Sequence, residues 1–348
     1  MSSFFTSKQV TVIIICLAAV FVVSGVLTIV VTLTDENINK TTGSDTGKQK
    51  NEYKFEIKSE GVDDKEKAED DTLVVKEALE NDPYEELNSL IGLESVKEEV
   101  RSLANYVKVQ KQREEKGLKN PKLSYHLVFT GSPGTGKTTV ARIVARIYKD
   151  LGILKKGHLV ETDRSGLIGQ YVGQTAPRVN EMCDSALNGV LFIDEAYAIT
   201  QGSEQDYGDE AVATLLKRME DDRDRLVVIV AGYTNEMKQF IASNPGLQSR
   251  FNKYINFPDY TPEELYDIFL MYLRKNEYTI SEEASVFLKK RLQYVVETKD
   301  RNFGNARYVR NVFEKAIQNQ ANRLASATNS SAEELTQLKL EDLKKAFR

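Results

Sequence analysis

The sequence predicts an α/β protein in which a parallel β-sheet lies between layers of helices, with a small all-α unit after it and one transmembrane helix before it. Three observations lead to this fold class. The segment "GSPGTGKT" joins a short apolar run to a stretch with helical apolar spacing, and a second apolar run, "GVLFIDEA", ends in two carboxylates. After Pro258 the pattern changes to helix caps and helical spacing. Strands that alternate with helices form parallel sheets covered on both faces.

Length and composition limit the classes of protein. At 348 residues, with 41% hydrophobic and 28% charged side chains, the chain has room for two or three units with buried cores. A net charge of -5 and the lack of a dense Lys/Arg block argue against a nucleic-acid partner. The two cysteines, Cys16 and Cys183, cannot make a disulfide framework, which is typical of a reducing compartment.

An uncharged segment, residues 10–33, predicts a membrane anchor. A helix over this range is roughly 36 Å long at ~1.5 Å per residue, enough to cross a hydrocarbon core of about 30 Å. A cleaved signal peptide is the alternative, but the run is longer than the usual ~15 apolar residues and no A-x-A site follows it. We therefore expect a tail (residues 1–9), a retained single-pass helix (10–33), and a polar, flexible linker (34–74).

The segment from Ser124 to Leu154 predicts a phosphate site. Leu127–Phe129 is an apolar run suited to a buried strand, and the apolar residues from Val140 onward recur at helical spacing. Between them the sequence matches G-x-x-x-x-G-K-[ST], whose backbone N–H groups wrap phosphates at a helix N-terminus. Lys137 would reach the β- and γ-phosphates of ATP, and the Thr138 hydroxyl would bind Mg²⁺. The predicted binding residues are Gly131, Ser132, Pro133, Gly134, Thr135, Gly136, Lys137 and Thr138.

Two carboxylates follow the apolar strand at Gly189–Ile193. Asp194 is predicted to hold the Mg²⁺, directly or through water, and Glu195 to orient the attacking water. In the alternative interpretation both residues only cap the end of the strand. The phosphate loop upstream favours the first interpretation, and the second carboxylate indicates hydrolysis as well as binding.

Six motifs follow one another in the chain: "LIGLESVKEEV", "VFTGSPGTGKTTVAR", "GQYVGQTAPR", "VLFIDEAYAI", "NPGLQSRF" and "FGNARYVRNVFEKA". In this order they resemble the AAA+ ATPases over roughly residues 83–325, and within them the CbxX/CfqX group. The resemblance implies a P-loop NTPase domain at residues 75–258, a helical lid at 259–348 and a homo-hexameric ring.

The resemblance also implies roles for single residues. Ile91 and Gly92, with Leu93, would line the adenine pocket. Asn235 would be the polar sensor of the γ-phosphate, with Thr234 as the alternative because "GYTN" is longer than the usual "ATN".

Two arginines have implied roles. Arg250, in "NPGLQSRF", would be an arginine finger that reaches the nucleotide of the adjacent subunit, an effect worth ~10³–10⁵ in rate in other nucleotide hydrolases. Arg307 would reach the phosphates from the lid, with Arg310 as the weaker candidate. Surface ion pairing is the alternative for each.

The lid should begin with a well-capped helix. In "TPEEL", Thr261 can cap, Pro262 suits the first helical position, and Glu264 completes a capping box. Further helices are predicted over residues 281–299, 305–325 and 340–347.

The segment "GLIGQYVGQT", residues 166–175, matches the aromatic–hydrophobic–Gly loop that AAA+ threading proteins project into the ring channel. Tyr171, Val172 and Gly173 would form this pore loop, since a large, stiff aromatic side chain can grip an extended polypeptide of almost any sequence. Burial of Tyr171 in an interface or against its own domain is the alternative.

The leading hypothesis is a membrane-anchored, Mg²⁺-dependent ATPase that remodels or partly unfolds a protein client through a ring pore. The alternative is an ATP-controlled assembly switch at the membrane without threading. A membrane-bound zinc protease needs H-E-x-x-H, and neither His126 nor His158 fits. Lysines after residues 10–33 and the abundance of ATP inside cells favour an ATPase body in the cytoplasm of a bacterium. No residue specifies the client.

Overall fold

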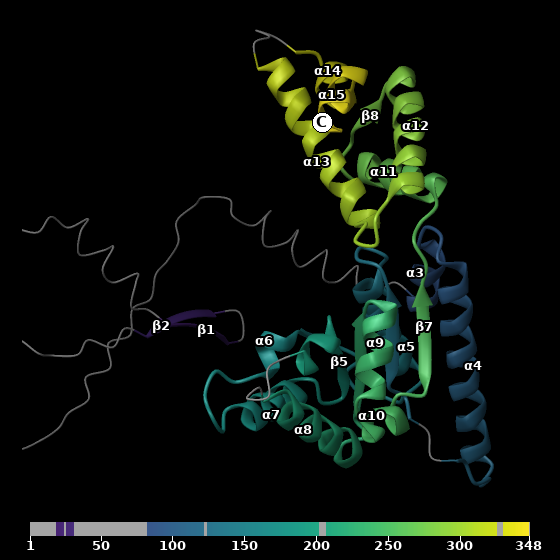
Figure 1. Cartoon of the computed structure of the whole chain (residues 1–348), viewed down its shortest axis with the longest axis vertical. Helices are drawn as coiled ribbons and strands as arrows, with labels where there is room; N and C mark the ends of the chain where they lie inside the picture. Colours follow the sequence, from purple (N-terminus) through teal and green to yellow (C-terminus); the bar gives the residue numbers. More distant parts are fainter. Residues whose placement is uncertain are drawn as a thin grey trace, which may run out of the picture. The chain divides into compact units, whose positions relative to one another are not determined.

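The computed structural model describes residues 82–121, 124–201, 207–325 and 330–347, together with 19–23 and 26–30. The chain divides into two compact units, Met1–Asp64 and Lys65–Arg348 (Figure 1).

In the first unit the described residues are two strands, β1 (Ala19–Val23) and β2 (Val26–Val30), which pair antiparallel. The helix predicted over residues 10–33 is therefore wrong at these ten residues. Valine, isoleucine and threonine suit a strand, and two residues between two such runs are typical of a hairpin. The rest of 10–33, the tail 1–9 and the linker 34–74 lie outside the described residues. No helix in the described part of the chain has the length and apolar character to cross a membrane.

The second unit contains a five-stranded sheet in the order β4-β5-β6-β3-β7, and all neighbouring strands are parallel. This confirms the predicted parallel sheet. The strands are β3 (Leu127–Gly131), β4 (Leu159–Thr162), β5 (Gly189–Ile193), β6 (Leu226–Gly232) and β7 (Lys253–Phe257).

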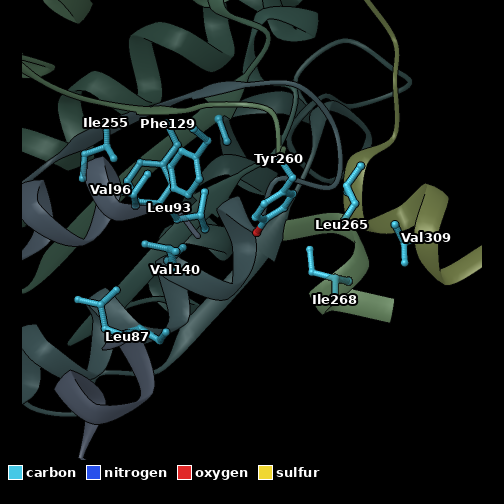
Figure 2. Close-up of a cluster of buried hydrophobic side chains, with 14 of the residues drawn as sticks. Leu87, Leu93, Val96, Phe129, Val140, Ile255, Tyr260, Leu265, Ile268 and Val309 are labelled. Carbon is cyan, nitrogen blue, oxygen red and sulfur yellow. The ribbon is translucent and has the colours of Figure 1, made fainter. Parts of the chain in front are cut away.

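Alternate strand residues face two separate cores, as side-chain period two requires. Phe129 and Phe192 belong to one core, and Val128 and Leu191 to the other. The first core is closed by α3 (Pro83–Ser89), α4 (Glu94–Glu115) and α5 (Lys137–Asp150), and Figure 2 shows Val96 beside Phe129, with Val140 and then Leu87 farther away in the same core. The second is closed by α7 (Thr175–Ser185), α8 (Gly208–Asp221), α9 (Thr234–Ala242) and α10 (Pro245–Arg250). The arrangement is the expected αβα sandwich.

The lid contains the predicted helices. The capping box of Thr261 and Glu264 is present at the start of α11. The lid is not entirely α-helical, because β8 (Thr279–Ile280) pairs with β9 (Gln337–Leu338) beside the short helix α14 (Ala332–Thr336). The main lid helices are α11 (Pro262–Lys275), α12 (Glu282–Thr298), α13 (Asn305–Leu324) and α15 (Leu340–Ala346), and α13 lies beside α11 and α15 (Figure 1).

The carboxyl ends of the parallel strands lie along one edge of the sheet, where ligands bind in open α/β folds. The chain leaves β3 into the phosphate loop and β6 into α9. It leaves β4 into α6 (Arg164–Leu167) and β5 into the 3₁₀ helix η1 (Ala196–Thr200). The phosphate loop, the two carboxylates after β5, the start of α9 and the segment after β4 therefore lie at this edge.

Candidate nucleotide-hydrolysis site

The phosphate loop has the backbone shape that its glycines allow. Gly134 (φ +69°) and Gly136 (φ +92°) lie in the left-handed region, which glycine adopts without steric penalty. A Cβ on Gly134 would also collide with the carbonyl oxygen of Gly304, so the loop packs directly against the lid. Helix α5 begins at Lys137, immediately after the loop. The loop therefore brings backbone N–H groups and a helix N-terminus together, an arrangement that favours phosphate.

Lys137 lies among the charges expected of a phosphate site. Its Nζ donates to the carbonyl oxygens of Gly131 (2.9 Å) and Ser132 (2.8 Å). Burial lowers the pKa of Lys137, the nearby carboxylate of Asp194 acts to raise it, and the guanidinium of Arg307 acts to lower it. A phosphate between the two cations would neutralise both.

Asp194 and Glu195 follow β5 with different local environments. The Asp194 N–H donates to the Thr162 carbonyl on β4 (2.9 Å), and Asp194 Oδ1 accepts the Glu195 N–H (3.0 Å). Glu195 is exposed and has a left-handed backbone (φ 48°, ψ 42°) at the cap of η1. This conformation costs about 1 kcal/mol for a residue with a Cβ, and such strain is concentrated at functional sites.

A cavity of about 340 Å³ opens beside the phosphate loop. Thr234 and Asn235, the first residues of α9, both line it, so both candidates for the polar sensor face the same space. The other lining residues are Gly131, Ser132, Tyr233, Glu236, Asn256, Phe257, Asp259 and Arg301.

The segment predicted to line the adenine pocket lies next to the phosphate loop. A Cβ on Gly136 would lie 3.5 Å from Leu93 Cδ1 and 3.5 Å from the Tyr260 hydroxyl, and one on Gly92 would collide with Glu264 of α11. Figure 2 shows Tyr260 between Leu93 and Leu265 of the lid. An apolar surface from both domains therefore adjoins the phosphate loop, as the recognition of a base requires.

Asn305, which the sequence analysis did not single out, connects three parts of this site. It is fully buried and has a left-handed backbone (φ 47°), a conformation that asparagine tolerates better than most residues. Its Oδ1 accepts the Tyr260 N–H (3.0 Å), and its Nδ2 donates to Asp259 Oδ1 (2.9 Å) and the Pro133 carbonyl (3.3 Å). The nearest sequence signal is the Gly-Asn pair at the start of the last long helix.

Two ion pairs at the junction of the lid and the sandwich were also missed. Lys299 Nζ lies 2.5 Å from Asp259 Oδ2, and an Arg301 guanidinium nitrogen lies 2.6 Å from Glu236 Oε1. Burial acts to raise the pKa of Asp259, but hydrogen bonds from Lys299, Asn305 and Ser132 hold it below its usual range. Asp259 and Arg301 therefore place charge on the wall of the cavity.

The two lid arginines named from the sequence have different surroundings. Arg310 Nε pairs with Glu314 Oε1 at 2.7 Å, four residues on along α13. Arg307 is exposed, and its charge acts on Lys137; it makes no ion pair within the described residues. This arrangement favours Arg307 as the phosphate-facing arginine.

Arg250 is not brought to the phosphate loop of its own chain. It is the last residue of α10, beyond the far end of α9, and α9 is about 13 Å long at ~1.5 Å per residue. An Arg250 terminal nitrogen lies 3.3 Å from Glu220 Oε2, and its Nε is buried without a hydrogen-bond partner in the described part of the chain.

The loop between α6 and α7 carries the most exposed large apolar side chains of the described residues. Tyr171 is 69% exposed and Val172 is 84% exposed. Gly173 follows with φ +79° and no atom within 4 Å of a Cβ built on it. Tyr171 is thus not buried against its own domain, which removes one of the two alternatives for it.

The residues at this edge fit ATP with Mg²⁺. The loop supplies backbone N–H groups and a lysine for phosphate, and its close contact with Gly304 leaves no room for side chains at Gly134. The Thr138 hydroxyl and the Asp194 carboxylate are oxygen ligands of the kind that Mg²⁺ prefers, with substrate phosphates completing the shell.

Comparison with known families agrees with this geometry. Residues 127–259 match the family described as "ATPase family associated with various cellular activities (AAA)". Residues 261–348 match the AAA lid domain.

The chain also resembles characterised proteins over most of its length. It is 42% identical to stage V sporulation protein K of Bacillus subtilis over 259 residues, which are 74% of this chain and 80% of that protein. It is 48% identical to the chloroplastic ribulose bisphosphate carboxylase/oxygenase activase of Cyanidioschyzon merolae over 237 residues, 68% of this chain and 80% of that protein. The crystal structure of the FIGL-1 AAA domain in complex with ADP has the same fold, with a TM-score of 0.52 at 19% identity over 74% of this chain and 82% of that one. With these relatives and both domains matched, the chain belongs to the AAA family of ATPases, which hydrolyse ATP with Mg²⁺.

Proposed function

We propose that the chain forms a closed ring, in keeping with the hexamers typical of AAA+ proteins, and remodels a protein client by drawing a segment of it past Tyr171. The observation that carries the proposal is the exposed pair Tyr171 and Val172 beside Gly173, on the loop between α6 and α7. Burying such side chains on a client offsets their exposure to water. One relative is named as an activase of another enzyme, which supports a protein client.

In this proposal each site residue has a separate task. The phosphate loop and Lys137 bind the β- and γ-phosphates, while Thr138 and Asp194 hold Mg²⁺, which neutralises charge on the phosphates. Glu195 orients the attacking water, and Thr234 or Asn235 contacts the γ-phosphate. Arg307 reaches the phosphates from the lid. Because Arg250 lies far from its own phosphate loop, it acts at the site of a neighbouring subunit.

The test is Tyr171→Ala, with Tyr294→Ala as the control, because Tyr294 is also exposed (54%) but lies on α12 in the lid. Full-length protein is assayed for ATP hydrolysis and for its stimulation by permanently unfolded casein. We expect Tyr171→Ala to lose stimulation by about tenfold with basal hydrolysis within about twofold of the parent, because the loop contacts the client and not the nucleotide. Unchanged stimulation in Tyr171→Ala would favour an assembly switch over a threading motor.

The client can be sought with Glu195→Gln, which should hold ATP and keep the ring closed. A photo-crosslinker placed at Val172 in that variant captures whatever protein lies in the pore. The same crosslinker at Val286, an exposed residue of α12, is the matched control.

Attachment to the cell membrane, with the ATPase body in the cytoplasm, is a separate proposal that rests on the uncharged composition of residues 10–33. Flotation of cell membranes that contain the chain with and without these residues tests it. Loss of flotation only in the deletion supports attachment, and equal flotation of both contradicts it.

A further inference from the structure

The short helix η1 connects the predicted hydrolytic residue to a single arginine. Glu195 is the cap of η1, so any movement of Glu195 displaces this helix directly. At the other end of η1 the Arg164 guanidinium donates to the carbonyl oxygens of Ala198 (2.6 Å) and Ile199 (3.2 Å). Carbonyl groups at a helix C-terminus lack partners within the helix, and a cation there is favoured by both hydrogen bonding and the helix dipole.

Arg164 is also the first residue of α6, which leads into the Tyr171 loop. The α6 turn is held rigidly: Asp163 Oδ1 accepts the N–H groups of Ser165 (2.8 Å) and Gly166 (3.3 Å), and Leu167 is buried. A displacement of the Arg164 guanidinium is therefore passed to the backbone of α6.

Both ends of the loop are anchored while its tip is exposed. The Gly169 N–H donates to the fully buried Thr175 hydroxyl (3.1 Å). The Arg178 guanidinium donates to the Ile168 carbonyl (2.9 Å). Residues 170–174 are exposed between these anchors, so a shift of α6 reaches the base of the Tyr171 loop through Ile168 and Gly169.

The sheet provides a second connection between the same regions, but of a different kind. The Asp194 N–H donates to Thr162 on β4, and β4 pairs with β5 over its length. These bonds make the two strands one rigid body, so they hold the strand ends together and transmit no movement of η1 relative to the sheet. Arg164 bridges η1 and α6 through its two hydrogen bonds to the Ala198 and Ile199 carbonyl groups.

We propose that Arg164 is a positioning residue that couples the nucleotide state sensed at Glu195 to the position of the Tyr171 loop. The role of this coupling in moving a client rests on the proposed function, but the coupling between Glu195 and the Tyr171 loop can be measured without a client. The hydrogen bonds of the Arg164 guanidinium to described residues go to η1, and none of them goes to the phosphate loop or to the residues that line the cavity.

The test is hydrogen–deuterium exchange of full-length protein, with ATP in the Glu195→Gln background and with ADP in the parent background. We expect amides of residues 168–174 to exchange with rates that differ by about fivefold between the two states, a typical size for coupled sites. Arg164→Met should reduce this difference to less than about twofold, because the side chain keeps its length and loses its donors. Arg164→Lys, which keeps one donor group, should retain an intermediate difference and provides the readout if the methionine variant does not fold.

Arg142→Met is the matched control, because Arg142 is an exposed arginine that pairs only with Glu161 at 3.3 Å among the described residues. It should preserve the full difference. A full nucleotide response of the loop in Arg164→Met, or no response in the parent, overturns the inference. Neither result depends on Tyr171→Ala, so failure of the coupling and failure of threading remain distinguishable.

Discussion

Glu195 combines exposure with a strained backbone, and this combination makes a specific prediction for its carboxylate. Replacing it as Glu195→Gln keeps the shape and removes the group that orients water, so hydrolysis should fall by at least about 100-fold. ATP affinity should change by less than about threefold, because the phosphate loop is untouched. Phosphate release and nucleotide titration measure the two effects. Glu161→Gln, at an exposed ion pair, should change neither, and normal turnover in Glu195→Gln would remove Glu195 from its assigned role.

His126 predicts how stability depends on pH. It is buried, and its Nδ1 accepts the Val228 N–H at 2.9 Å, so the ring is neutral in the folded chain. Burial, together with the charge of Arg250, lowers its pKa from 6.5 to about 4. Between these two pH values the unfolded chain binds a proton that the folded chain does not. The contribution of His126 to the free energy of unfolding is therefore fully present above pH 6.5. It decreases as the pH falls towards 4, by roughly 3 kcal/mol at most.

Urea unfolding between pH 4 and 7 measures this dependence. His126→Asn should lower stability at pH 7 because the Val228 hydrogen bond is altered, and should flatten the slope below pH 6.5. A slope in the variant equal to that of the parent would assign the acid sensitivity to other groups.

At the scale of elements, Asn305 joins the phosphate loop, the interdomain segment at Asp259 and the lid helix α13. Asn305→Ala leaves the Tyr260 N–H and the Pro133 carbonyl without partners and places alanine in a left-handed backbone. We expect a loss of about 2–4 kcal/mol in the stability of the lid contact, from a buried donor at about 1–3 kcal/mol and backbone strain at about 1 kcal/mol.

The urea midpoint and the ATP dissociation constant test this expectation, because the lid must close on the nucleotide. Asn302→Ala is the control, since Asn302 is exposed in the loop before α13 and, among the described residues, hydrogen-bonds only through its backbone N–H to Asp300. Equal midpoints for the two variants would show that the Asn305 contacts do not stabilise the lid.

The elements that the sequence predicted correctly are those with local causes. The phosphate loop and the α11 capping box depend on residues within a few positions of one another, so both can be recognised from the sequence alone. Asn305 could not be found this way, because its partners lie near residues 133 and 259, far away in the chain. The error at residues 19–23 and 26–30 has another cause: an uncharged run rich in Val and Ile is compatible with both a membrane helix and a pair of strands, and periodicity does not separate them.

For the whole molecule, the position of Arg250 determines whether one chain contains a complete hydrolytic site. Arg250 and Lys137 lie on separate parts of the same sandwich, with α9 between the cavity and α10. A head-to-tail contact repeated around a closed ring would bring the Arg250 surface of each chain to the phosphate loop of the next. In that arrangement the unit of activity is the interface between two chains.

Mixing two inactive variants tests this interface. Lys137→Ala cannot bind phosphate but retains Arg250, and Arg250→Ala retains the phosphate loop but should lose ~10³–10⁵ in rate. In randomly mixed rings, about one interface in four pairs an intact Lys137 with an intact Arg250, so ATP hydrolysis should recover to about a quarter of the parent rate. The control is a mixture of Lys137→Ala with Glu195→Gln. This mixture would recover ATP hydrolysis only if Glu195 also acted across the interface. Because Glu195 follows β5 in the same sandwich as Lys137, we expect no recovery. Recovery confined to the first mixture would place Arg250, and not Glu195, on the neighbouring chain, whereas no recovery in either mixture would return Arg250 to a structural role beside Glu220.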